Sequence, residues 1–67
     1  MKVFCINNVN TDGKLTVGKW YSVCEYVIIA GSELYHIIDD TGDEHRYLSR
    51  RFKTEEEVRL EKLNQVI

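Results

Sequence analysis

The sequence predicts a mainly β fold: a small five-stranded antiparallel barrel or sandwich, followed by an α-helix at the C-terminal end. Three observations lead to this prediction. Short β-prone runs follow one another at close spacing, separated by turn residues, and the chain contains no proline. The last part of the chain carries a helix-start signature and then apolar residues at helical spacing. With 67 residues, the chain is long enough for one domain only.

The first β-prone run, KVFCIN at residues 2–7, alternates so that Val3 and Cys5 share one face. A turn-rich loop follows, and residues 14–17 form a short extended piece. Gly18 ends this piece, and we expect a positive φ there because glycine adopts it without steric cost.

The longest β-prone run covers residues 19–29. We expect Tyr21 and Val23 to point to the core, which leaves the other face to Trp20, Ser22, Cys24 and Tyr26. The predicted core of the whole domain comprises Val3, Cys5, Leu15, Val17, Tyr21, Val23, Tyr35, Ile37 and Phe52.

Two further strands, residues 33–39 and 44–49, flank a turn at residues 40–43 in which glycine takes the left-handed position. The pairing expected from a two-residue hairpin turn is Ile38 opposite His45 and His36 opposite Tyr47. The two histidines would then be diagonal neighbours on one face of the sheet.

The C-terminal helix is predicted at residues 55–65. Thr54 and Glu57 have the spacing of a capping box, and Glu55 and Arg59 have the spacing of an ion pair along a helix. A narrow apolar stripe consists of Leu60, Leu63 and Ile67. We therefore divide the chain into a barrel at residues 1–53 and a helix at residues 54–67. This helix either packs on the barrel or extends from it, where it could form a homodimer.

Composition and charge exclude several functional classes. The net charge of −2 argues against a dedicated electrostatic nucleic-acid binder. No run approaches the roughly 18 apolar residues of a membrane span. Cys5 and Cys24 lack the local Cys/His pairs that zinc sites use, and we expect the first strand to have no leader-like segment before it. We expect a cytoplasmic protein with reduced thiols, without a cofactor and without membrane contact.

Four separated segments, contained in KVFCINN, LTVGKWYSV and YHIIDDTGDEHRYLSRRF, resemble the small SH3-like barrel proteins encoded by bacteriophages. That family pattern opens with Lys-x-x-Cys-Ile-Asn and continues with Leu-Thr-x-Gly-Lys-x-Tyr-x-Val. A Tyr-x-Ile-x-(Asn/Asp)-Asp-x-Gly hairpin and a closing Arg-Phe complete it. The matching positions lie within residues 1–53 and are Lys2, Cys5, Ile6, Asn7, Leu15, Thr16, Gly18, Lys19, Tyr21, Val23, Tyr35, Ile37, Asp39, Asp40, Gly42, Arg51 and Phe52.

The resemblance implies a five-stranded SH3-like barrel and a phage origin, and phage proteins of this size often bind and inhibit a host protein. The chain departs from the family pattern at two places. Leu48 follows Tyr47 where many members have proline, and a charged helix is added after Phe52. The chain also lacks the Trp-Trp pair of peptide-binding SH3 domains, so binding of proline-rich peptides is not implied.

Candidate partner-binding residues are the aromatic, basic and histidine side chains expected outside the core. Trp20 is either an interface residue, as tryptophan often is, or ordinary core beneath the C-terminal helix. The basic cluster at residues 46–53 either binds acidic groups or phosphates, or pairs with the glutamates of the helix. The predicted site residues are Trp20, Tyr26, His36, Arg46, Tyr47, Arg50 and Arg51.

No pattern in the chain predicts catalysis or metal binding. His36 and His45 would need a third ligand or a nucleophile, and Glu44 is expected to point away from them. The acidic residues near the turn lack the alternate spacing of a calcium loop.

We therefore expect a non-enzymatic phage protein that binds a host protein, a defence or gene-expression factor, and inhibits or redirects it by steric occlusion. The alternatives are a nucleic-acid-binding barrel and a self-associating structural protein.

Overall fold

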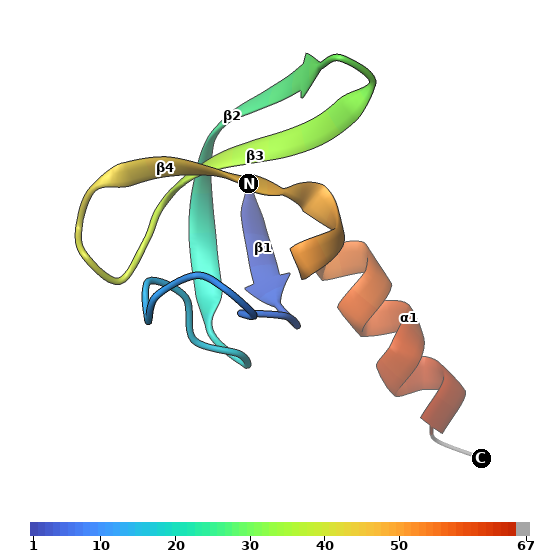
Figure 1. Cartoon of the computed structure of the whole chain (residues 1–67). Coiled ribbons are helices and arrows are strands. Elements are labelled where there is room, and N and C mark those ends of the chain that lie inside the picture. The colour runs from blue at the N-terminus through green and yellow to red at the C-terminus, as the bar shows by residue number, and fades with distance from the viewer. Residues whose placement is uncertain (66–67) are drawn as a thin grey trace.

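The computed structural model of the chain describes residues 1–65 and consists of one five-stranded antiparallel sheet and a C-terminal helix (Figure 1). The elements in chain order are β1 (Lys2–Cys5), β2 (Trp20–Ile29), β3 (Ser32–Ile38), β4 (Glu44–Leu48), a 3₁₀ turn (Ser49–Arg51), β5 (Phe52–Thr54) and α1 (Glu55–Gln65). The predicted mainly β class and the predicted helix are confirmed.

The strands are ordered β4-β3-β2-β1-β5 across the sheet. The long strand β2 belongs to both halves, since it pairs with β1 over Trp20–Ser22 and with β3 over Val23–Ile29. In Figure 1 the lower part of β2 runs beside β1 and the upper part beside β3. The outer strands β4 and β5 do not pair with each other, so the sheet is open and the predicted closure into a barrel is not observed.

One face of the sheet carries the core, which consists of Val3, Cys5, Leu15, Tyr21, Tyr35, Ile37 and Phe52. Three tyrosine rings surround Phe52 edge-on, with centroid distances of 6.3 Å for Tyr21, 6.0 Å for Tyr35 and 6.5 Å for Tyr47. This is a favoured geometry for aromatic pairs. All seven core residues were predicted, and Val23 packs against them. The prediction for Val17 is wrong, because this side chain is 52% exposed.

Residues 14–17 do not form a strand, and β5 supplies the fifth strand instead. This segment is held by side chains and not by a ladder of backbone hydrogen bonds. Leu15 is buried, and the hydroxyl of Thr16 donates to Asp40 Oδ2 at 2.6 Å. Gly18 has a φ of 89°, as predicted. Because Leu15 and Thr16 anchor the loop, Val17 can face solvent.

A β-bulge interrupts the pairing of β2 with β3 between Val23 and Glu25. A bulge inserts one extra residue and thereby reverses the alternation of side chains beyond it. Tyr26 therefore pairs with Tyr35 on the core side of the sheet, whereas Trp20 lies on the outer side. The prediction that Trp20 and Tyr26 share a face is wrong for this reason.

The predicted register of the β3–β4 hairpin is also wrong by one residue. Its connection covers residues 39–43, which is longer than a two-residue turn. The observed pairs are Tyr35 with Tyr47, His36 with Arg46 and Ile37 with His45. The two histidines consequently lie on opposite faces, and Glu44 Oε2 lies 3.5 Å from His36 Nε2 instead of pointing away.

Asp39 is the centre of a buried polar network at this hairpin. Its fully buried carboxylate accepts hydrogen bonds from the amide (3.0 Å) and hydroxyl of Thr41 and from the hydroxyl of Tyr47 (2.7 Å), and lies 2.6 Å from His45 Nδ1. Burial opposes ionisation, but these hydrogen bonds outweigh it and hold the pKa of Asp39 well below its usual range. Burial and the bond to Asp39 raise the pKa of Tyr47.

Asp40 connects the same hairpin to the loop before β2. It accepts hydrogen bonds from Lys19 Nζ at 2.6 Å, from Thr16 Oγ1 at 2.6 Å and from the hydroxyl of Tyr21 at 3.0 Å. The bond from Lys19 is the main reason why the pKa of Asp40 is lowered. Asp39 and Asp40 are thus engaged with side chains of the fold itself.

The helix begins directly at the end of the sheet, since β5 ends at Thr54 and α1 starts at Glu55. The predicted capping box is confirmed: the amide of Glu57 donates to Thr54 Oγ1 at 3.2 Å, and the amide of Thr54 donates to Glu57 Oε1 at 3.3 Å. An ion pair between Lys53 and Glu61 joins β5 to the helix.

The apolar stripe of α1 is not covered by the sheet. Leu60 and Leu63 are 52% and 64% exposed, and Ile67 lies outside the described residues. The predicted ion pair between Glu55 and Arg59 is absent, because residues 1–65 place no carboxylate within 4 Å of Arg59. Within this part of the chain, no helix has the length and apolar character needed to cross a membrane.

Candidate functional site

Trp20, the only tryptophan of the chain, lies at the start of β2 on the outer face of the sheet. It is opposite Phe4 of β1, and the two ring centroids are 5.0 Å apart with the planes tilted by 59°. Trp20 is 40% exposed, so α1 does not bury it as ordinary core. The ring is thus supported from one side by Phe4 and remains accessible to a ligand.

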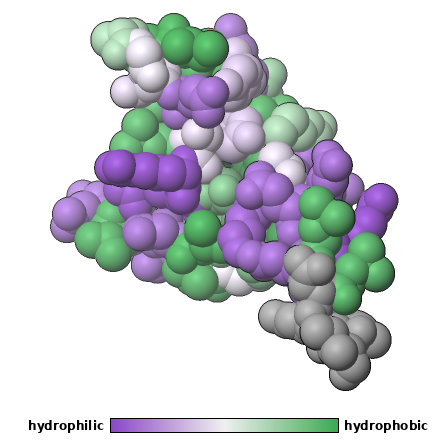
Figure 2. All heavy atoms as spheres, turned by 90° about the vertical axis from the view of Figure 1, so that its right-hand side faces the viewer, coloured by the Kyte–Doolittle hydropathy of each residue, from purple (hydrophilic) through white to green (hydrophobic). Residues whose placement is uncertain are grey.

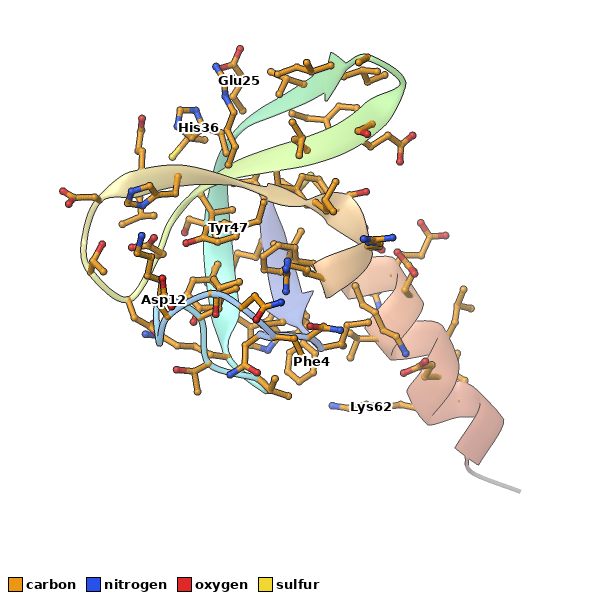
Figure 3. The ribbon with its side chains drawn as sticks, viewed as in Figure 1. Phe4, Asp12, Glu25, His36, Tyr47 and Lys62 are labelled. Atoms are coloured by element: carbon orange, nitrogen blue, oxygen red, sulfur yellow. The ribbon has the colours of Figure 1, made fainter. Side chains whose placement is uncertain are left out.

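A groove of about 640 Å³ separates this part of the sheet from the helix. Its lining residues are Met1, Lys2 and Trp20 on the sheet side and Glu55, Val58, Arg59 and Lys62 on the helix. Figure 3 shows that the side chain of Lys62 extends from α1 toward the side on which Phe4 lies. The groove is largely open to solvent and is not an enclosed cavity.

Three of the four charged side chains that line the groove are basic. The basic residues are Lys2, Arg59 and Lys62, and the acidic residue that lines the same groove is Glu55. In residues 1–65 none of the three basic side chains has a carboxylate within 4 Å. These charges are therefore available for an external anion, and their attraction acts over about 8 Å at physiological salt.

An exposed aromatic ring beside unpaired cations favours a ligand that combines a flat or apolar group with negative charge. Arg59 can bind a carboxylate in a bidentate manner, whereas the two lysines act as point charges. An apolar side chain of a partner could pack on Trp20, and acidic residues next to it in the partner could reach Lys2 and Lys62. No three His, Cys, Asp or Glu side chains of residues 1–65 are arranged to hold a metal ion.

Of the predicted site residues, only Trp20 lines this groove. Tyr26, 48% exposed, lies at the other half of β2 and packs on Tyr35 with a centroid distance of 5.6 Å. Tyr47 is engaged with Asp39, as described above.

His36 lies on the outer face of β3, where Glu25 Oε2 is 3.8 Å and Glu44 Oε2 is 3.5 Å from its ring nitrogens. Arg46 is its cross-strand neighbour. This group of polar side chains lies on the half of the sheet formed by β2, β3 and β4, away from the pairing of β1 with β5.

Arg50 and Arg51 line a separate hollow beside the loop after β1. Arg51 is already bound there, since its Nη1 donates to Asn7 Oδ1 at 3.1 Å and to the carbonyl of Val9 at 2.8 Å. Pairing of the basic cluster with the helix is observed for Lys53 alone among the described residues. The predicted basic residues therefore do not converge with Trp20.

Sequence reasoning missed Lys2, Phe4, Arg59 and Lys62 as parts of one site. One signal was present: Arg59 and Lys62 are three positions apart and so share one face of a helix. Nothing in the sequence, however, specifies that this face lies opposite Trp20. That placement depends on the direction in which the helix leaves β5.

Comparisons of this chain with protein-family models, with curated proteins and with solved structures give no match.

Proposed function

We propose that this chain is a non-enzymatic binding module that holds an acidic segment of a partner protein in the groove between Trp20 and α1. The observation that carries the proposal is the exposed ring of Trp20 beside three basic side chains without a carboxylate partner in residues 1–65. Tryptophan and arginine are the residue types most enriched among those that dominate binding energy at interfaces.

The aromatic and the basic residues of the groove contribute differently to binding. Trp20 supplies apolar contact area and is held by Phe4, so it loses little freedom when a partner binds. Lys2, Arg59 and Lys62 supply positive potential, which accelerates encounter with an acidic partner and disfavours basic ones.

We further propose that the partner is a bacterial host protein, a defence or gene-expression factor, and that the module acts in the host cytoplasm by covering its surface. The support is the resemblance of residues 1–53 to phage proteins of this size. An SH3-like arrangement is part of the same proposal. It is supported by the bend of β2 at the bulge and by the short 3₁₀ turn that joins β4 to β5.

The decisive experiment is affinity capture from host lysate with matched variants, followed by mass spectrometry. The wild-type chain and Tyr26→Ala should retain the same partner, whereas Trp20→Ala and the double variant Arg59→Glu/Lys62→Glu should lose it. Tyr26 is the matched control because it is an exposed aromatic residue on the same strand but outside the groove. Circular dichroism establishes that each variant is folded.

Direct binding is measured with the purified partner, or with a synthetic peptide of its acidic segment, by the change in Trp20 fluorescence. Affinity should fall as salt rises, since three cations contribute. A partner retained equally by wild type and all groove variants would contradict the proposed site.

Single-stranded DNA serves as the competing ligand, because a nucleic-acid-binding domain is the second candidate. The observation that favours it is the hollow lined by Arg50 and Arg51, which lies outside the groove beside Trp20. Binding of labelled DNA that weakens in Arg50→Ala but not in Arg59→Glu/Lys62→Glu would replace the first proposal by this one.

A further inference from the structure

Glu55 is the one acidic side chain among the residues that line the groove between Trp20 and α1. It is exposed, and no basic side chain of residues 1–65 lies within 4 Å of its carboxylate. The carboxylate of Glu55 therefore faces a ligand in the groove without an ion-pair partner. An acidic residue at this position would repel part of an acidic ligand, so its presence calls for an explanation.

The stability of the helix does not account for an acidic residue at this position. Glutamates in the first turn of a helix interact favourably with the positive end of its dipole. The first turn of α1 contains three of them, Glu55, Glu56 and Glu57, and Glu57 also forms the capping box. A neutral residue at position 55 would leave the other two in place. Glu56 does not line the groove, so the helix and the groove place separate demands on these glutamates.

The two ends of the groove differ in charge. Val3 pairs with Thr54 in the ladder between β1 and β5. Lys2 precedes Val3 and Glu55 follows Thr54, so antiparallel pairing brings Lys2 and Glu55 to the same end of the groove, the near end. The near end thus carries one positive and one negative side chain and has no net charge.

The far end of the groove is formed by Trp20, Arg59 and Lys62. Arg59 and Lys62 lie about 6 Å and about 10.5 Å beyond Glu55 along the helix axis, at about 1.5 Å per residue. Figure 3 shows Lys62 extending toward the side of Phe4, which pairs with Trp20. In Figure 2, which faces the side of the molecule where α1 lies, hydrophilic side chains gather around the helix beside smaller apolar patches. The far end combines an aromatic ring with two positive charges.

We infer that Glu55 is a specificity-determining residue, which restricts the groove to segments that are acidic at one end only. The occupant is an extended segment of the partner protein, with its acidic residues at Arg59 and Lys62 and a neutral residue at Glu55. This inference rests on the proposed function of the groove. An extended chain at about 3.4 Å per residue covers the distance from Glu55 to Lys62 in about three residues, which sets the spacing between the neutral and the acidic position.

Repulsion by Glu55 acts mainly on the near end. The screening length at physiological salt is about 8 Å, which is shorter than the roughly 10.5 Å between Glu55 and Lys62 along the helix. An acidic group at Lys62 is therefore little affected. An additional acidic group at the near end is attracted by Lys2 and repelled by Glu55, so it adds no affinity. Such a repulsive element is a common means of rejecting wrong partners, in this case uniformly acidic segments.

The test uses two acetylated and amidated peptides, SSSLEE and EESLEE, which carry two and four negative charges. Both offer a leucine to Trp20, and EESLEE presents acidic residues to the near end in whichever direction it binds. Neither peptide contains an aromatic residue, so the change in Trp20 fluorescence measures the affinity of each. The wild-type chain should bind EESLEE no more tightly than SSSLEE. Glu55→Gln should bind EESLEE about threefold more tightly than SSSLEE, because Lys2 then attracts the additional charges without opposition.

Glu56→Gln is the matched control, because it removes the same charge from the same helical turn but outside the groove. It should bind both peptides as the wild type does. The inference is overturned, and the proposed function stands, if the wild type or Glu56→Gln prefers EESLEE as strongly as Glu55→Gln does, or if Glu55→Gln has no preference. The proposed function itself fails if the wild type binds neither peptide at millimolar concentration, or if binding persists unchanged in Arg59→Glu/Lys62→Glu.

Discussion

Replacing Asp39 by asparagine removes the charge from the buried carboxylate but keeps its size and one of its two oxygens. Oδ1, which accepts both hydrogen bonds from Thr41, can be retained. Oδ2, which contacts the hydroxyl of Tyr47 at 2.7 Å and Nδ1 of His45 at 2.6 Å, becomes an amino group that donates. The substitution therefore acts on two hydrogen bonds and adds no cavity.

The expected loss of stability follows from those two bonds. A hydrogen bond to a charged group contributes roughly 1.5–3 kcal/mol and one between neutral groups about 1 kcal/mol. Two such exchanges lower the free energy of unfolding by about 2–3 kcal/mol. For a domain of this length, that corresponds to a decrease in Tm of roughly 10–20 °C.

The pH dependence supplies a sharper test. Because folding lowers the pKa of Asp39, its contribution is complete above the unfolded pKa of about 4 and is lost as the pH falls below it. Urea denaturation of wild type and Asp39→Asn, followed by Trp20 fluorescence at several pH values, measures both effects. The two stability curves should converge as the pH falls from about 5 to 2. Parallel curves, or a loss below about 0.5 kcal/mol at neutral pH, would refute the assigned role of Asp39.

Three further predictions concern the helix, the thiols and the hairpin turn. Thr54→Ala should lower the free energy of unfolding by about 1 kcal/mol through loss of the capping box, whereas Thr54→Ser should preserve it; urea denaturation distinguishes the two. In the folded protein Cys24 should react with a thiol reagent and buried Cys5 should not, and Cys24→Ser should abolish the reaction. Partial desolvation and Glu44 raise the pKa of Cys24, so the rate should still be increasing at alkaline pH. Gly42→Ala should lower the free energy of unfolding by about 1–2 kcal/mol, because alanine is strained at the φ of 86° that Gly42 adopts. This strain is the whole effect, since no atom lies within 4 Å of an added Cβ, and Gly42→Asn should lower the free energy of unfolding less.

The core and the helix could be predicted from the sequence because both depend on local periodicity. Alternation in β1 placed Val3 and Cys5 inside, and the capping-box spacing placed the first residue of α1 correctly at Glu55. These signals are contained within a few neighbouring residues. They do not depend on how distant segments meet.

The wrong predictions concern segments in which one inserted residue changes the face or the pairing partner of every residue after it. Period-2 reasoning assumes an uninterrupted strand, and the bulge after Val23 moved Tyr26 to the core side. Likewise, the longer connection at Asp39 changed the partner of His45 from Ile38 to Ile37. The segment around Val23 contains no glycine of the kind that often indicates a bulge, whereas the connection after Ile38 does contain one, Gly42, with a φ of 86°.

The groove could not be predicted because it depends on the angle between two elements. Trp20 was recognised by its residue type, but two of its cationic neighbours, Arg59 and Lys62, belong to the opposite end of the sequence. Their approach depends on the path of the chain through the 3₁₀ turn and β5. Sequence periodicity contains no information on that path.

The direct junction of β5 and α1 at Thr54 has a consequence for the rate of binding. Thr54 is both the last strand residue and the residue that caps the helix, so there is no hinge between them. The two walls of the groove are consequently preorganised, and a partner does not lose affinity to the ordering of a mobile arm. Association should then proceed in a single kinetic phase. If a few glycines were inserted after Thr54, α1 would become flexible relative to the sheet. The chain would then bind its partner weakly, although the sheet would stay folded.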